Sequence, residues 1–238
     1  MAAWRDMSLQ PIVSQRLYQQ VAESIKQQIQ SGTLAAGERL PSEKVLAQQL
    51  GVSRPTVREA MIALEIAGLV EIRSGSGSYV REKSVGLTPT IDTGPGPIEL
   101  LKARMLIEGE VAAEAAARAS KRDLALIKNS IEQMEFMMAS GEHGRSADQS
   151  FHVNIARASG NDVLASIVGN LWEGMFSPLF SKLSERTHLV SRQEAALKDH
   201  KAIFAALSTR DSIGARAAMR QHLTKVQNIL SDADLFQE

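Results

Sequence analysis

The chain has no cysteine and few aromatic residues, and both scarcities narrow what it is able to do. Without a single cysteine among 238 residues, disulfide bonds, thiolate nucleophiles and cysteine-ligated zinc sites are all excluded. Aromatic residues make up 4% of the chain and hydrophobic residues 44%, so aliphatic and alanine side chains must supply the core. This balance favours helices, in a chain long enough for two domains.

Targeting segments and an excess of one charge are also missing. The N-terminus lacks a basic start followed by an apolar stretch, and no uncharged apolar run approaches the ~20 residues that a membrane helix needs. We therefore expect a cytoplasmic protein without membrane contact. The 27 basic and 27 acidic residues give a net charge of zero, which argues against a nonspecific nucleic-acid coat but permits a specific binder with a few positioned contacts.

The most informative stretch that is present runs from residue 40 to residue 80, LPSEKVLAQQLGVSRPTVREAMIALEIAGLVEIRSGSGSYV. A short helix is predicted to begin at Pro41 and Ser42 and to end at Gly51, with an apolar face of Val45, Leu46 and Leu50. A second helix follows, with an apolar face of Val57, Met61, Leu64 and Ile66. Residues 69–73 and 78–80 favour strands around a tight turn, so the whole stretch has the layout of a winged helix-turn-helix.

The start of the second helix is the predicted DNA-reading surface. Ser53 can cap the helix and Pro55 occupies its first turn, where no amide donor is needed. Four polar residues of this first turn are able to reach phosphates and base edges in a major groove: Ser53, Arg54, Thr56 and Arg58. The alternative is that Arg54 and Arg58 are solvated or pair with Glu59 and other neighbours.

This stretch resembles the DNA-binding domain of GntR-family transcription regulators. The resemblance rests on LPSE, on LGVSRPTVREA, on LE..GLVE and on the glycine-bearing wing. It implies operator contacts from the two helices and from the wing, at Lys44, Arg54, Thr56, Arg58, Ser74, Gly75 and Ser76. Ser53 and Arg73, at the start of the second helix and the base of the wing, complete the predicted set.

Composition divides the chain into two parts. A helix from residue 14 to residue 31 is predicted to pack against the winged motif, through Leu17, Val21, Ile25 and Ile29. Residues 84–98, SVGLTPTIDTGPGPI, hold three glycines and three prolines without helical periodicity. We expect a DNA-binding domain at 1–83, a linker at 84–98 and a second domain at 99–238.

The second domain is predicted to be an antiparallel helical bundle. Helices are expected at residues 99–119, 121–140, 146–158, 161–184, 191–208 and 211–231, with short connections and no strand run. The fold class is therefore mainly α, with an N-terminal winged helix-turn-helix whose only strands form the wing, followed by an all-α bundle.

Polar residues occupy core positions on three of these helices. His200 falls on the stripe Leu197, Phe204 and Leu207; His222 falls on the stripe Ala215, Met219, Val226 and Ile229; and Asp148 and His152 lie one turn apart. One such histidine is more often an ordinary core residue, but three with a nearby aspartate favour a metal site. The set suits a divalent ion with open coordination positions, zinc first, with nickel, manganese, cobalt and iron as alternatives.

The second domain resembles the FCD effector domain of the FadR-type branch of the GntR family. The segments ELLKARMLIEGEVAAEAAA, DQSFHVNIARASGN, DHKAIFAALSTRD and ARAAMRQHL carry this resemblance. It implies metal ligands at the same four positions, Asp148, His152, His200 and His222. It also implies that Arg104 binds an effector carboxylate beside the metal, whereas the residues alone permit an ordinary i, i+4 pair with Glu108.

The expected function is that of a homodimeric transcription regulator, a repressor, and not an enzyme. It would bind a palindromic double-stranded operator and respond to a small carboxylic acid. VEIRSGSGSYV, GPIELLKARMLIE and SIVGNLW resemble the hexuronate-responsive regulators of the family, which favours a hexuronate or aldonate as effector. The alternatives are control by lactate, glycolate or a dicarboxylate with a purely structural metal, and a metal-dependent hydrolase.

Overall fold

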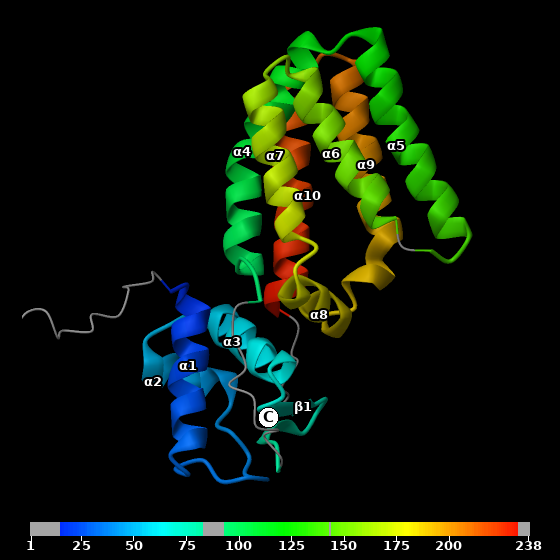
Figure 1. Ribbon diagram of the computed structural model, residues 1–238. Helices are drawn as coiled ribbons and strands as arrows, with labels where there is room; N and C mark the ends of the chain where they lie inside the picture. Colours follow the sequence, from blue (N-terminus) through cyan, green and yellow to red (C-terminus); the bar gives the residue numbers. More distant parts are fainter. Residues whose placement is uncertain (1–14, 83–92, 143, 233–238) are drawn as a thin grey trace, which may run out of the picture.

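A computed structural model describes residues 15–82, 93–142 and 144–232 of the chain. Figure 1 shows a helical bundle standing on a smaller domain that contains the only strands of the described residues. Residues 1–14 and most of the predicted linker at 84–98 lie outside the described residues. The first helix of the bundle begins at Pro97, so the last two residues predicted as linker already belong to it.

The smaller domain has the predicted winged helix-turn-helix. Its elements are α1 (Leu17–Gln30), α2 (Glu43–Leu50), α3 (Arg54–Ile66), β1 (Val70–Arg73) and β2 (Gly77–Val80). The Ser53 side chain caps α3 by accepting the Thr56 amide at 3.3 Å, and Gly51 ends α2 in the left-handed conformation at φ +67°. The strands pair antiparallel, with Val70 opposite Val80.

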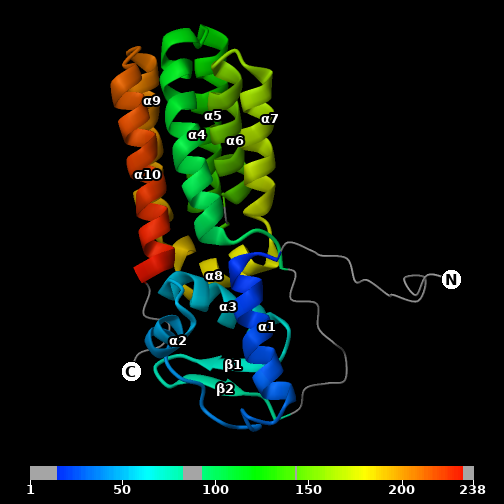
Figure 2. The same cartoon turned by 90° about the vertical axis from the view of Figure 1, so that its left-hand side faces the viewer.

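The bundle is built from long helices (Figure 1), and α10 lies at one side of it, packed against α4 and α9 (Figure 2). Its elements are α4 (Pro97–Arg118), α5 (Lys121–Ala139), α6 (Arg145–Ala158), α7 (Asp162–Gly174), α8 (Pro178–Arg186), the 3-10 turn η2 (Leu189–Arg192), α9 (Gln193–Ser208) and α10 (Ser212–Asp232). The mainly α fold class is confirmed.

The prediction of one helix over residues 161–184 is wrong. The chain breaks after Gly174 because Ser177 caps a new helix, accepting the Phe180 amide at 3.2 Å, and Pro178 in its first turn has no amide to continue the old one. The two helices meet at 64°. Within the described residues no single helix is long and apolar enough to cross a membrane, although α7 and α8 together meet that length and composition.

Some apolar faces were also predicted incorrectly. Ile66 at the end of α3 is 40% exposed, Leu17 on α1 is 45% exposed, and Val45 and Leu50 on α2 are exposed as well. Single apolar residues on a surface are common, so helical spacing alone does not place a residue in the core. The principal stripe residues Val57, Met61 and Leu64 are buried as predicted.

The two domains are joined by specific polar contacts. Arg186 of α8 forms an ion pair with Glu65 of α3 and also donates to the Ile72 carbonyl oxygen. The Tyr18 hydroxyl donates to the Gly94 carbonyl oxygen at 2.8 Å. In Figure 2, α8 lies between the bundle and α3. The end of the bundle is therefore fixed to the helix that is predicted to read DNA.

Glu59 makes one of these contacts in an unfavourable environment. Its side chain is 4% exposed and accepts the Ile98 amide at 2.9 Å, where α4 begins. Burial raises the pKa of Glu59 to about 7; the Ile98 amide and Lys102 oppose this shift, and Glu99 adds to it. The folded protein therefore holds a proton on this carboxyl at a pH where the unfolded chain has lost it.

We expect stability to fall as pH rises from about 4.5 to about 7, because the raised folded-state pKa favours folding only while Glu59 stays protonated. The shift corresponds to about 3 kcal/mol at most. Glu59→Gln keeps an acceptor for Ile98 and should be more stable than the wild type at pH 8, with little difference at pH 4.5. Urea unfolding at both pH values, with exposed Glu132→Gln as control, measures this; an equal effect of Glu59→Gln at both values would contradict it.

Candidate metal centre and nucleic-acid interface

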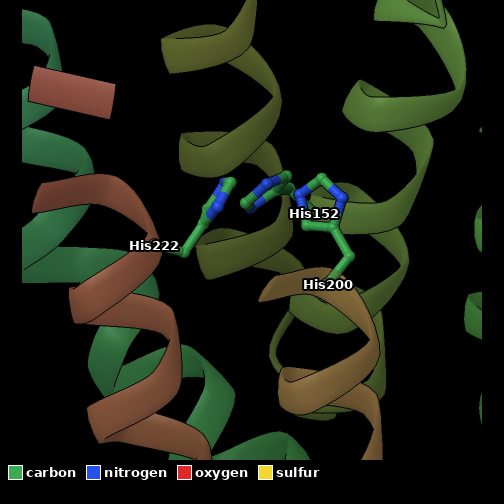
Figure 3. Close-up of side chains that lie close together, drawn as sticks. All are labelled: His152, His200 and His222. Atoms are coloured by element: carbon green, nitrogen blue, oxygen red, sulfur yellow. The ribbon is translucent and has the colours of Figure 1, made fainter. Parts of the chain in front are cut away.

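Three histidines from three helices meet inside the bundle (Figure 3). His152 comes from α6, His200 from α9 and His222 from α10, and one ring nitrogen of each lies within 4.8 Å of those of the other two. The side chains of these residues are almost fully buried, with residue exposures of 1%, 1% and 4%. Buried imidazoles that converge in this way are a typical nitrogen-ligand set for a divalent metal.

Asp148 adds an oxygen to the cluster. Its Oδ1 lies 3.4 Å from His152 Nε2 and 3.3 Å from His200 Nε2. Burial opposes ionisation of this carboxyl, but the imidazoles of His200 and His152 outweigh it and hold the pKa of Asp148 below its ordinary value. The structure thus brings together the four residues that the sequence predicted.

Several polar atoms of the cluster make no hydrogen bond with any described residue, although His222 Nδ1 lies 3.7 Å from Asp199 Oδ2. Asp148 Oδ1, His152 Nε2, both ring nitrogens of His200 and His222 Nδ1 are buried without a hydrogen-bond partner there. Buried polar atoms are normally satisfied, and several orphans around one point indicate a missing ligand. Burial also lowers the pKa of His200 well below its ordinary value, and lowers that of His222, so both rings are neutral and able to donate lone pairs near pH 7. The residues therefore fit a divalent metal.

Glu108 orients one of these ligands, a role that sequence reasoning missed. Its Oε2 lies 2.5 Å from His152 Nδ1, which leaves Nε2 of the same ring for the metal position. Its Oε1 accepts from Arg104 Nε at 2.5 Å. Burial would raise the pKa of Glu108, but the charges of Arg104 and His152 outweigh burial and lower it to about 2. The i, i+4 spacing predicted the pair of Glu108 with Arg104, but no pattern in the sequence predicted the contact of Glu108 with His152.

Arg104 lies at the edge of the same cluster. It is 2% exposed, and its guanidinium carbon stacks 4.2 Å from the centre of the Trp172 ring. The predicted pair with Glu108 forms and does not remove Arg104 from the site, since Arg104 also lines the central cavity. Its Nη1 makes no hydrogen bond with any residue of the described part of the chain, and one donor group is therefore left for a ligand.

The cavity beside the histidines has a volume of about 720 Å³. All helices of the bundle and η2 contribute to its wall, including Arg104, Asp148, His200 and His222. Small-molecule sites generally measure about 300–1,000 Å³ and combine apolar walls with a few convergent polar groups. The arrangement can hold a metal at one end and a small ligand against it.

The predicted DNA contacts form two exposed groups on the winged domain. Lys44, Ser53 and Arg54 are exposed and Thr56 is half-buried, at the start of the two helices. The wing residues Arg73, Ser74, Gly75 and Ser76 are exposed as well. Arg73 lies 2.9 Å from Glu71 and stacks on Tyr79, so its side chain is held at the base of the wing.

Arg58 does not lie with the other predicted contacts. It is 2% exposed, pairs with the buried Glu43 at 2.7 Å, and donates to the carbonyl oxygens of Leu230 and Ser231 at 3.1 and 2.6 Å. Its partners are 15, 172 and 173 residues away, which no local pattern reveals. In this arrangement Arg58 joins α2, α3 and the end of α10, and its guanidinium is buried away from the exposed groups.

A winged helix-turn-helix with exposed basic residues, joined to a helical domain with an internal ligand-sized cavity, defines a DNA-binding transcription regulator. The comparisons with known proteins give its family. Residues 17–80 match the model of bacterial regulatory proteins of the gntR family, and residues 99–225 match the FCD domain. The chain belongs to the GntR family and carries an FCD domain.

Relatives and solved structures agree with this assignment. The chain is 37% identical over 234 residues to the Exu regulon transcriptional regulator of Escherichia coli K12, covering 93% of this chain and 88% of that protein. It is 36% identical over 225 residues to the Uxu operon transcriptional regulator of the same strain, covering 91% and 88%. The structure of E. coli McbR/YncC is similar, with 25% identity, a TM-score of 0.50 and coverage of 93% and 99%. The family and these relatives are transcription regulators and not enzymes, so the hydrolase reading is wrong.

Proposed function

We propose that this regulator is a cytoplasmic homodimeric repressor whose affinity for a palindromic operator is controlled by a small carboxylic acid. The effector would be a sugar acid, a hexuronate or aldonate, bound at a divalent metal and paired with Arg104. The observation that carries the proposal is the convergence of Asp148, His152, His200 and His222 at one end of a 720 Å³ cavity. The Uxu operon and Exu regulon regulators support the choice of a hexuronate.

The four predicted ligands would hold the metal, zinc first, and leave coordination positions facing the cavity. The metal would supply a Lewis-acidic centre for carboxylate and hydroxyl oxygens. Arg104 would neutralise the remaining carboxylate charge through Nη1, while Glu108 keeps the guanidinium and the His152 ring in place.

The effector site is connected to the DNA-binding domain through two helices. The helix α10 carries His222 in the cavity wall, and the carbonyl groups at its end accept hydrogen bonds from Arg58 of α3. The helix α8 lines the cavity through Phe180 and holds Glu65 of α3 through Arg186. A ligand that favours one position of these helices would shift the two recognition helices of a dimer relative to each other and change operator affinity.

Thermal unfolding of the metal-loaded protein against a panel of acids tests the proposal. The panel contains hexuronates, aldonates, lactate, glycolate and a dicarboxylate. A selective sugar acid at 100 times its Kd should raise the melting temperature by about 5–10 °C. Arg104→Ala should abolish the rise, and it should abolish release of upstream operator DNA by the same acid.

The control variant is Arg118→Ala on the same helix. Arg118 pairs with Glu114 at 3.0 Å on the outer surface, so its loss should leave the ligand response unchanged. No shift with any acid, in protein shown to contain metal, would contradict the effector proposal and favour a structural metal. A selective shift with lactate, glycolate or the dicarboxylate would replace the sugar acid by that class.

A further inference from the structure

A second cationic group faces the effector cavity at a distance from the histidines. Arg145 is the first residue of α6, the helix that also carries Asp148 and His152, and it lines the same cavity. The rise of ~1.5 Å per residue places it about 10 Å along the helix axis from His152. A ligand that reached from the metal position to Arg145 would therefore have a chain of several carbon atoms with a polar group at each end.

The surroundings of Arg145 hold its guanidinium in place. The Nη1 donates to Ser181 Oγ of α8 at 3.2 Å. The guanidinium carbon lies 5.7 Å from the ring centre of Phe176 and 5.9 Å from that of Phe180. Aromatic rings and one hydroxyl orient a guanidinium without neutralising it. Arg145 is thus positioned by neutral groups from a different part of the chain.

Its charge is not compensated by any described residue. The other buried cation of the cavity, Arg104, pairs with Glu108 at 2.5 Å, and Lys225 at the rim pairs with Asp199 at 2.6 Å. For Arg145, no carboxylate oxygen of residues 15–82, 93–142 or 144–232 lies within 4.0 Å. A half-buried guanidinium without a counter-charge is well suited to bind an anion in bidentate fashion.

We propose that Arg145 and Ser181 form a second anion subsite, and that the effector is a polyhydroxy acid with an anionic group at both ends. This inference rests on the proposed sugar-acid effector and, within that class, favours a dianionic acid over a hexuronate or a simple aldonate. One carboxylate lies at the histidines and Arg104, and the second anionic group, a carboxylate or a phosphate, lies at Arg145. The hydroxyl groups between them face a wall that includes Ser184 and Asn228.

The test is calorimetric titration of the metal-loaded full-length protein with acids that share a six-carbon chain. Gluconate and glucuronate carry one anionic group, glucarate carries two carboxylates, and 6-phosphogluconate carries a carboxylate and a phosphate. We expect one of the dianionic acids to bind about 10–100-fold more tightly than the monoanionic acids, because a charge-assisted bidentate contact is added. The dianionic acid that binds more tightly shows whether the second group is a carboxylate or a phosphate.

Arg145→Gln should remove this advantage and leave the affinity for gluconate and glucuronate within about threefold. Arg192→Gln is the matched control, since Arg192 lines the rim of the same cavity but is exposed. It should lower the affinity for the dianion less than Arg145→Gln does. The unfolding midpoint without ligand should stay near the wild-type value in both variants.

Two other results would overturn the inference in distinguishable ways. Equal affinity of mono- and dianionic acids, or equal weakening of both by Arg145→Gln, would contradict the second anion subsite but not the proposed function. If none of the acids bound to protein shown to contain metal, the sugar-acid effector and the subsite would both fail. Saturable binding of glucarate or 6-phosphogluconate that Arg145→Gln selectively weakens supports both.

Discussion

His200→Ala is expected to abolish metal binding and the response to the effector while the protein still folds and binds its operator. The variant removes one of four converging ligands, and outer partners alone typically change metal affinity 10–100-fold, so the loss of a ligand itself should exceed about 100-fold. Folding should survive because His200 makes no hydrogen bond with any described residue, and burial keeps its imidazole uncharged.

Metal content after dialysis against a weak chelator measures the first effect, and operator binding by fluorescence anisotropy with and without the effector measures the second. His188→Asn is the control. His188 is exposed, lies outside the cluster and has a φ of +51°, which asparagine tolerates better than alanine. If His200→Ala failed to fold, the metal would be structural; if it still released DNA on effector binding, the metal would not take part in sensing.

A change in Glu108, the partner of His152, should have an intermediate effect on metal affinity. Glu108→Gln keeps the shape of the side chain but removes the charge that holds His152 and Arg104. We expect metal affinity to fall about 10–100-fold, between the wild type and His200→Ala. If Glu108→Gln bound metal as tightly as the wild type, Glu108 would not position His152 for coordination.

The sequence predicted the histidine cluster because each histidine interrupts an apolar stripe. His200 lies on the same face as Leu197 and Leu207, which are 8% and 0% exposed, so the period of the helix alone turns the imidazole inward. Short connections then make the helices neighbours. The contact between Glu108 and His152 was not predicted, because the choice of which imidazole a carboxylate touches depends on the rotation of neighbouring helices, which no local pattern records.

The winged motif was predicted for a related reason. Caps, turn residues and apolar spacing are all local, and Ser53, Gly51 and Pro55 act within their own turns. The break between α7 and α8 carried local signals too, in Ser177 and Pro178, and the continuous apolar pattern obscured them. Exposure was predicted less well, as Leu17 and Arg58 show, because it depends on contacts made between distant segments.

Arg58→Met is expected to destabilise the protein by about 3–5 kcal/mol. Glu43 is 4% exposed, so removing Arg58 would leave a buried carboxylate without its bidentate partner, at 2.9 and 2.7 Å. The carbonyl groups of Leu230 and Ser231 at the end of α10 would lose a donor as well. Urea unfolding measures the change in free energy. The double variant Glu43→Gln with Arg58→Met should recover part of the loss, because the buried carboxylate charge that Arg58 neutralises is then absent as well.

The comparison with Arg54 separates stability from recognition. Arg54, at the start of the same helix, also lies 4.0 Å from Glu43, but its side chain is 51% exposed, so Arg54→Met should change stability by less than about 1 kcal/mol. Its operator affinity should fall by about 1–3 kcal/mol for each half-site, if Arg54 reads a base edge. For Arg58→Met we expect the reverse, with the larger effect on stability and the smaller effect on operator affinity. If it instead weakened only operator binding and left unfolding unchanged, Arg58 would be a DNA contact in solution, and its pair with Glu43 would not join the domains.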